Sequence, residues 1–173
     1  AIVNNTTGPL LIGWASRDVT TDKPVCVHGQ FHLRISEKVL DPITVTALAI
    51  DSGGDAVIFL SGDVTGFYAF MVRKIRNRLA ELAPDLPADK IVMNATHTHT
   101  TGDIAGMAKA GVDYPCDLER MPTEEYQEFF VSSAAAAIIE AWNTRKPGAV
   151  AWGYGFAATG HSRRTVYFDD VSK

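Results

Sequence analysis

Two histidines within a run of threonines are the residues of this chain best suited to chemistry. His97 and His99 lie in the segment 94–101, NATHTHTT. In extended backbone, side chains two residues apart leave on the same face, so both imidazoles can converge on one ion or one substrate group. Neutral imidazole is a good zinc ligand, and the neighbouring hydroxyls and Asp103 can orient it. The segment predicts a metal site; the alternative is a hydrogen-bonded polar loop.

The elements around this segment predict where it lies. Asp63 follows the apolar run 56–60, AVIFL, and the histidines follow a second apolar run, 90–95. Between these runs, residues 67–82 show the apolar period of a helix that ends before two prolines. Strand, helix and strand in this order predict a right-handed crossover between parallel strands, whose carboxyl ends meet at one edge. We therefore expect Asp63 to lie beside His97 and His99.

The remaining segments predict one α/β unit covering residues 1–173. We expect a mixed, largely parallel sheet with flanking helices, and no linker divides the chain. The other expected elements are a strand at 10–20, a strand at 43–51 that forms a hairpin with 56–60, a helix capped by Thr123 with Glu124 and Glu125 in its first turn and ending near Trp142, and a strand at 149–156.

Composition excludes several classes of protein. With 46% hydrophobic and 21% charged residues, the chain can bury a core and is not of the disordered type. A net charge of -4 makes nucleic acid an unexpected partner. No apolar run is long enough to span a bilayer. Residue Ala1 is not an initiator methionine, so the sequence is compatible with earlier removal of a signal peptide. The compartment is therefore left open, and secretion is one of the alternatives.

Two further groups of basic residues have both a functional and an ordinary interpretation. His28 and His32 lie in VHGQFHLR, where Arg34 follows. We interpret His28 as structural and leave open whether His32 and Arg34 approach the site. Near the end of the chain, Arg163 lies in GHSRR. An arginine can hold a carboxylate or a developing oxyanion through two bonds; the alternative is a solvated turn.

Four motifs in order along the chain resemble the neutral, non-lysosomal ceramidase family. They are GWASRDVT at 13–20, GQFHLR at 29–34, the aspartate at 63 after a strand, and THTH at 96–99. The resemblance implies a zinc-dependent hydrolase of amide bonds. It implies that His97 is a zinc ligand and that His99 lies beside the metal and acts on the substrate. Arg163 is the best match to an active-site arginine of the family.

The resemblance also implies that this chain is the amino-terminal portion of a larger ceramidase-like catalytic domain. The family's other zinc ligands and its catalytic serine come from sequence beyond residue 173, so a second chain or further residues would complete the site. The expected substrate is a small-molecule or lipid amide, an N-acyl sphingoid or a related N-acyl compound. We expect Gly13, through a nearby backbone amide, and Asp63 to contact it.

Two other functions fit parts of the pattern. One is a metal-dependent hydrolase of another family with a His-x-His pair, such as the amidohydrolase barrels. Those barrels carry the pair on their first strand, whereas at least three expected strands and a helix precede it here. The other is a non-catalytic domain that binds a lipid or sugar without metal. Metal analysis of the protein separates an enzyme from such a binding domain.

Overall fold

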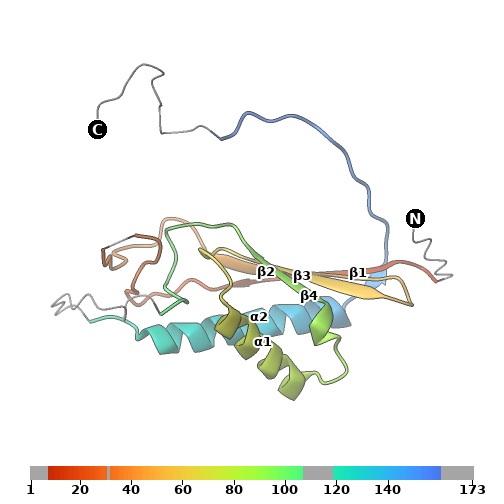
Figure 1. Cartoon of the computed structure of the whole chain (residues 1–173), viewed down its shortest axis with the longest axis horizontal. Coiled ribbons are helices and arrows are strands. Elements are labelled where there is room, and N and C mark those ends of the chain that lie inside the picture. The colour runs from red at the N-terminus through yellow and green to blue at the C-terminus, as the bar shows by residue number, and fades with distance from the viewer. Residues whose placement is uncertain (1–7, 31, 107–118, 161–173) are drawn as a thin grey trace, which may run out of the picture.

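The computed structural model describes residues 8–30, 32–106 and 119–160. They form a five-stranded mixed sheet in the order β4-β3-β2-β1-β5, with both α-helices on one face (Figure 1). Neither helix has the length and apolar character that crossing a membrane requires, in the part of the chain described. The elements are β1 (Leu11–Asp18), β2 (Thr44–Asp51), β3 (Ala56–Gly62), α1 (Ala69–Leu82), the 3₁₀ turn η1 (Ala88–Lys90), β4 (Ile91–Ala95), α2 (Thr123–Asn143) and β5 (Lys146–Pro147).

The prediction of an α/β fold with a mixed sheet and flanking helices is confirmed. The hairpin of β2 and β3 and the parallel pairing of β3 with β4 across α1 are both present. The sheet is less parallel than expected, because β1 pairs antiparallel with β2 and with β5. Among the described strands that are neighbours in the sheet, only β3 and β4 are joined through a helix, and parallel neighbours need such a crossover.

The second helix begins one residue earlier than the sequence suggests. Pro122 occupies the N-cap position and Thr123 is the first helical residue, so the threonine hydroxyl does not cap the helix. The correction has a physical basis, since a proline fixes φ and has no N–H to leave unsatisfied at a helix start. Glu124 and Glu125 do lie in the first turn, where the helix dipole favours carboxylates.

The strand expected at 149–156 is not paired in the structure. Only Lys146 and Pro147 pair with β1, and residues 149–160 continue as an exposed arm without regular structure. The arm leaves the sheet edge after Gly148, so no described strand lies alongside it to accept its hydrogen bonds. In Figure 1 it rises from the end of β5 and passes over the face of the sheet opposite to the helices.

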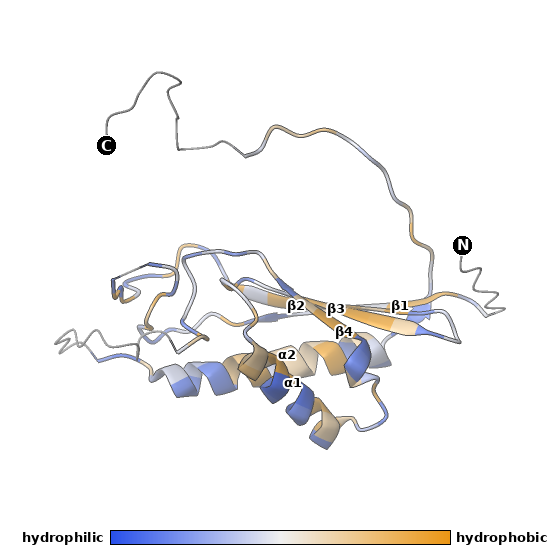
Figure 2. Ribbon diagram, viewed as in Figure 1, coloured by the Kyte–Doolittle hydropathy of each residue, from blue (hydrophilic) through white to orange (hydrophobic). Residues whose placement is uncertain are grey.

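The core lies between the sheet and the two helices. Small residues line the part of the sheet under α2, which lets the helix backbone approach closely: a Cβ at Gly13 would lie 1.8 Å from the carbonyl oxygen of Ala141. Larger buried side chains fill the space beside this contact, and Figure 2 shows hydrophobic, orange stretches in the strands and in both helices. They include Ile58, Leu60, Met71, Ile75, Leu79, Tyr126, Phe130 and Ile138.

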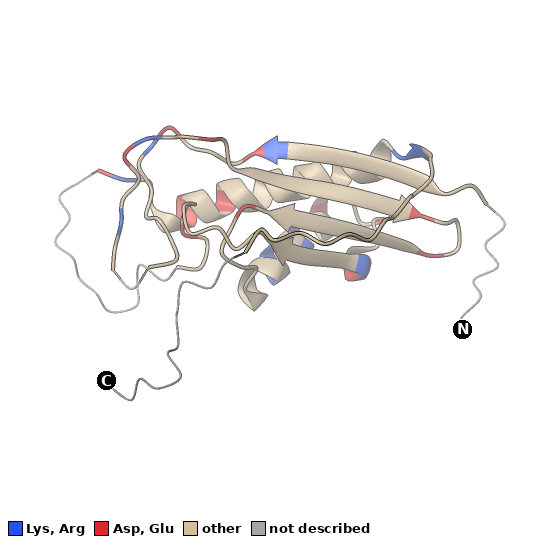
Figure 3. Cartoon of the chain, turned by 90° about the horizontal axis from the view of Figure 1, so that it is seen from above, with Lys and Arg blue, Asp and Glu red and all other residues tan. Residues whose placement is uncertain are grey.

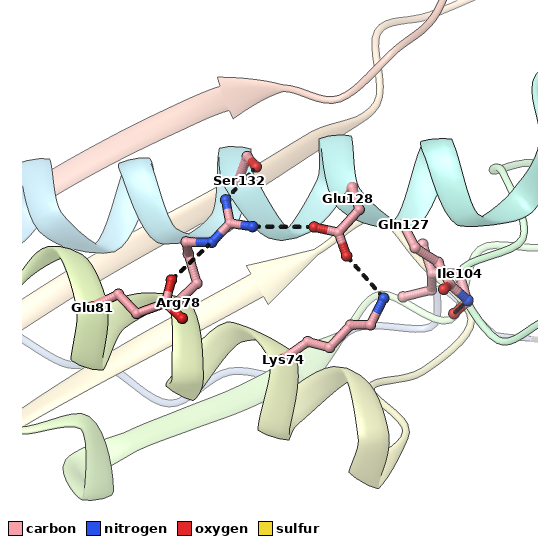
Figure 4. Close-up of polar contacts among 7 residues, drawn as sticks. All are labelled: Lys74, Arg78, Glu81, Ile104, Gln127, Glu128 and Ser132. Carbon is pink, nitrogen blue, oxygen red and sulfur yellow. Dashed lines mark hydrogen bonds and ion pairs between the residues drawn. The ribbon is translucent and has the colours of Figure 1, made fainter.

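Charged side chains join the two helices at the surface (Figure 4). Glu128 of α2 accepts from Lys74 Nζ at 2.9 Å and from Arg78 Nη2 at 3.1 Å, both on α1. The hydrogen bond from Lys74 is the main reason that the pKa of Glu128 is lowered. Since a lowered carboxyl pKa stabilises the fold above the unfolded pKa, this contribution is present at neutral pH and is lost as the pH falls through the folded value. Exposure keeps it small.

Replacing Gly13 by alanine is expected to destabilise the fold. The added methyl would collide with the backbone of α2 at Ala141, and overpacking of this kind costs about 3 kcal/mol. Urea unfolding followed by circular dichroism measures the loss. Gly66→Ala is the control, because nothing lies within 4 Å of a Cβ built there; equal stability of the two variants would mean that α2 does not pack on β1 as described.

Candidate functional site

The histidine box, residues 96–99, begins where β4 ends and lies beside the loop that follows β3. Two backbone hydrogen bonds hold these segments together: Thr96 N–H donates to Gly62 O at 3.1 Å, and His97 N–H donates to Val64 O at 3.0 Å. The predicted meeting of two parallel strand ends is therefore present, and it brings the histidine box next to residues 62–65.

His97 adopts a backbone conformation that was not expected. Its φ is 61°, in the left-handed region that is uncommon for residues other than glycine, whereas the sequence predicts extended backbone here. The ring is held by Nδ1, which donates to the carbonyl oxygen of Thr65 at 2.6 Å. Unfavourable conformations of this kind persist where the surroundings fix them, and they concentrate at functional sites.

His99 is held from the other side, by the loop of residues 26–35. Its Nδ1 donates to the carbonyl oxygen of Gly29 at 2.6 Å. The Arg34 side chain donates to the carbonyl oxygen of His99. Gly29 has a φ of 103°, and a Cβ there would lie 2.4 Å from Cγ of the His99 ring. Only glycine therefore permits both the turn and this contact.

These contacts fix the tautomer of both rings. A carbonyl oxygen only accepts hydrogen bonds, so each Nδ1 carries the proton and each neutral ring has its lone pair on Nε2. The two Nε2 atoms lie 3.3 Å apart, with the rings edge to face at a centroid distance of 4.8 Å. Two lone pairs at this distance repel, and a proton or a cation between them would remove the repulsion.

The spacing of the two nitrogens fits a zinc ion. Nitrogens bound to one tetrahedral zinc at about 2.0 to 2.1 Å lie roughly 3.3 Å apart, which is the distance between Nε2 of His97 and Nε2 of His99. A backbone carbonyl on the far nitrogen is also the usual support for a ligand imidazole. Within residues 8–30, 32–106 and 119–160, no group of three or more His, Cys, Asp or Glu residues is arranged to hold a metal.

Asp63 braces the site. Its Oδ2 accepts from the amide and the hydroxyl of Thr44, at 2.9 and 3.0 Å, and its Oδ1 accepts from the Thr96 hydroxyl at 3.2 Å. Both carboxylate oxygens are thus used to join β2, the end of β3 and the start of the histidine box. The expected proximity of Asp63 to the box is present at Thr96.

The hydroxyls and Asp103 do not orient the rings in the way that the sequence suggests. Thr98 and Thr100 bond to each other at 2.9 Å. The Asp103 carboxylate accepts from the amides of Ala105 and Gly106, at 2.8 and 3.1 Å, and so supports its own turn. Backbone carbonyls take the orienting role instead.

A cavity of about 510 Å³ lies beside the box, within the range typical of small-molecule sites. Asp63, Thr98 and Thr100 line it on one side and the loop 34–43 on the other, with Tyr126 in its wall. Burial raises the pKa of that tyrosine, so it stays neutral. The Arg34 Nε is buried in this wall without a hydrogen-bond partner.

Among the residues that it describes, the structure does not bring the other predicted site residues to the histidine box. Gly13 lies under α2, and its cross-strand neighbours Ala49 and Ile58 lead to Ile91, the first residue of β4. It is therefore three strands across the sheet from β4 and about 16 Å along the strand direction from Thr96. Arg163 lies outside the described residues. His32 is exposed, whereas His28 bonds through Nδ1 to the Thr65 hydroxyl.

Sequence reasoning missed Gly29 and Thr65 and left Arg34 undecided. Gly29 and Thr65 act through their backbone carbonyls, and a role of the backbone cannot be predicted from the type of side chain. The GQFHLR segment contains two of the three, so its resemblance to the ceramidase motif was the available signal. The sequence left open whether Arg34 approaches the site, and in the structure its side chain donates to the His99 carbonyl oxygen.

Solved ceramidases have the same fold. No protein-family model matches this sequence, and no curated protein matches it. A ceramidase complexed with C2 superimposes with a TM-score of 0.64 at 16% identity over 81% of this chain. A neutral ceramidase from Pseudomonas aeruginosa superimposes with a TM-score of 0.64 at 17% identity, also over 81%. This chain spans 22% of the length of each. At these identities the likeness establishes the fold.

Replacing Gly29 by alanine is expected to displace the His99 ring. The methyl would overlap the ring at 2.4 Å, and the φ of 103° is strained for alanine, so the bond from Nδ1 to Gly29 O breaks. Long-range ¹H–¹⁵N spectra of the imidazoles report this: the His99 signals lose the Nδ1–H tautomer pattern while those of His97 keep it. Gln30→Ala, at the exposed neighbour, is the control. Unchanged His99 signals in Gly29→Ala would contradict the described contact.

Proposed function

We propose that this chain is the amino-terminal portion of a ceramidase-like hydrolase that cleaves amide bonds with zinc. The observation that carries the proposal is the pair of Nε2 lone pairs 3.3 Å apart, each ring fixed through Nδ1 by a backbone carbonyl. The likeness in fold to solved ceramidases supports the proposal. The position of the pair also supports it, because the pair lies at the carboxyl ends of two parallel strands, the edge at which α/β sheets carry their sites.

The distance between the two Nε2 atoms would let both rings bind one zinc. In this proposal His97 alone of the two is a zinc ligand and His99 lies beside the metal, and the mutants described below separate the two arrangements. The Nδ1 bond of His97 to Thr65 leaves Nε2 as the donor atom and fixes the plane of the ring, and its amide bond to Val64 fixes the backbone. Zinc, when bound, polarises a carbonyl group and lowers the pKa of a coordinated water. A catalytic zinc takes three protein ligands, so the others come from outside the described residues, in the rest of the same domain.

His99 is the residue that moves a proton. Its Nε2 can accept one from an attacking water and return it to the leaving amine. The carbonyl of Gly29 keeps Nδ1–H in place and stabilises the positive charge that the ring then carries, as the orienting acceptor does in other histidine-dependent hydrolases. The bond from Arg34 to the His99 carbonyl holds the main chain still during the transfer.

The proposed substrate is an N-acyl lipid or a related amide. The cavity, which is lined by Thr98 of the box but by neither histidine, offers apolar walls from residues such as Val25, Ile35 and Ile43, with polar groups from Arg34 and Asp63. This combination is suited to a molecule with an acyl chain and a polar head. Arg163 stays the candidate for holding the developing oxyanion. Gly13, at the far end of the sheet, has no part in the proposal.

Alanine replacements of the two histidines test the proposal in the natural polypeptide that contains these residues. His97→Ala removes a ligand, so zinc content and activity fall together. His99→Ala removes a proton carrier, so most of the zinc stays and turnover falls by roughly 10² to 10⁴. Zinc is quantified by mass spectrometry, and hydrolysis is assayed on N-acyl amides with short and long chains.

His32→Ala is the matched control, because that ring is exposed in a neighbouring segment and should affect neither measurement. Full zinc and full rate in both His97→Ala and His99→Ala would reduce the histidine box to a structural loop. Equal loss of zinc in both would show that the pair chelates jointly and that His99 has the wrong role here.

A further inference from the structure

The face of the sheet turned away from the helices carries an apolar row that spans four strands. Trp14, Leu48, Phe59 and Val92 are direct cross-strand neighbours on β1, β2, β3 and β4. Trp14 is 63% exposed, Phe59 40% and Val92 49%. A second apolar row, Ile12, Ile50 and Val57, lies beside the first in the same register.

A sheet face that meets water is normally polar. Here the polar side chains are confined to the end near the histidine box, where they form the row Ser16, Thr46, Ser61 and Asn94 and, beyond it, the pair Asp18 and Thr44. Figure 3 shows the charged residues at strand ends, loops and helices, with the middle of the open face free of them. An apolar surface of this extent on a globular protein marks a contact with another element.

The exposed arm after β5 has the complementary pattern. In AVAWGYGFA, residues 149–157, the large apolar side chains alternate with alanine and glycine. Val150, Trp152, Tyr154 and Phe156 are 60%, 90%, 83% and 93% exposed. The Tyr154 and Phe156 rings contact each other edge to face at 5.3 Å. A period of two is that of a strand with one apolar face.

We propose that residues 149–157 form a strand of a second β layer that packs on this open face, with their large side chains against the row from Trp14 to Val92. The occupant is a segment of the same chain, already tethered at the edge of the face. Gly148 N–H donates to Leu10 O at 2.9 Å, and Gly148 lies against Ile12 of the second apolar row. Figures 1 and 3 both show the arm crossing over this face.

The dimensions agree with this assignment. Nine residues of strand extend about 30 Å, whereas four strands span roughly 14 Å from the first to the fourth. The arm can therefore reach the whole row from its tether, and stacked sheets about 10 Å apart leave room for interleaved aromatic side chains.

A strand laid on a sheet face gains no backbone hydrogen bonds from it. The N–H and C=O groups of residues 149–157 must then pair with another strand of the second layer, which lies outside the described residues. The resulting order of layers is helices, first sheet, second sheet. The inference is independent of the metal site, since none of its residues contacts the histidines.

Tryptophan fluorescence tests the position of the arm in the natural polypeptide that contains these residues. Trp14→Phe with Trp142→Phe leaves Trp152 as the one tryptophan among the three in residues 1–173; any further tryptophan is likewise replaced by phenylalanine. The expected result is blue-shifted emission that acrylamide quenches weakly. Emission and quenching equal to those of the urea-unfolded chain would overturn the proposal.

Four residues of strand from Gly148 extend about 13 Å, and three strand spacings from β5 reach β3 at about the same distance, so the proposal places Trp152 near Phe59. A double-mutant cycle tests this contact. Phe59→Ser and Trp152→Ser are each expected to lower Tm by about 5 °C or more, and together by less than the sum, because either change already breaks the shared contact. Leu82→Ser is the control, since Leu82 is 61% exposed on α1, away from this face, and should lower Tm by much less.

Two results of the cycle would overturn the assignment. Additive losses of Tm would give Trp152 another partner. Shielding of Trp152 that disappears on hundredfold dilution, together with a dimer by light scattering, would place the arm on a second copy of the chain.

Discussion

The parallel pairing of β3 with β4 is the constraint on which the candidate site depends. Because the chain crosses over through α1, both strands end at the same edge, with Gly62 opposite Ala95. The hydrogen bonds from Thr96 to Gly62 and from His97 to Val64 extend this pairing beyond the last ladder residues. The carbonyl of Thr65 is thereby presented to the His97 ring, and a shift of register by one residue would remove it.

A third segment completes the arrangement from the other side. The loop 26–35 is fastened by isolated bridges between Cys26 and Ile35 and between Val27 and Gly102. These bridges fix Gly29, which has to be a glycine for His99 to lie where it does. Three stretches distant in sequence thus hold two imidazoles mainly through backbone atoms, so the orientation of the rings depends on the fold more than on neighbouring side chains.

The sequence predicts much of this arrangement and misses parts of it for identifiable reasons. The elements from β2 to β4 follow from their apolar periods, and polar residues after two strands located the box. The antiparallel direction of β1 could not be read, because parallel and antiparallel strands share a period of two. Gly13 was expected near substrate and packs on α2; both roles require the absence of a side chain, so the residue type does not separate them.

The arm illustrates a different limit. The strand expected at 149–156 is not formed by the described residues, because a strand also needs a neighbour to pair with. Pattern describes what a segment can do, and pairing depends on what the rest of the molecule brings beside it.

At the left-handed backbone position of His97, stability and function favour different residues. At a φ of 61° the chain by itself would favour glycine, since a side chain in this region costs roughly 1 to 2 kcal/mol. A histidine here is a stability cost carried at one position, of the kind that proteins retain where a side chain is needed for activity. Selection for thermal stability alone would therefore drive residue 97 toward glycine and erase the site while leaving the sheet intact.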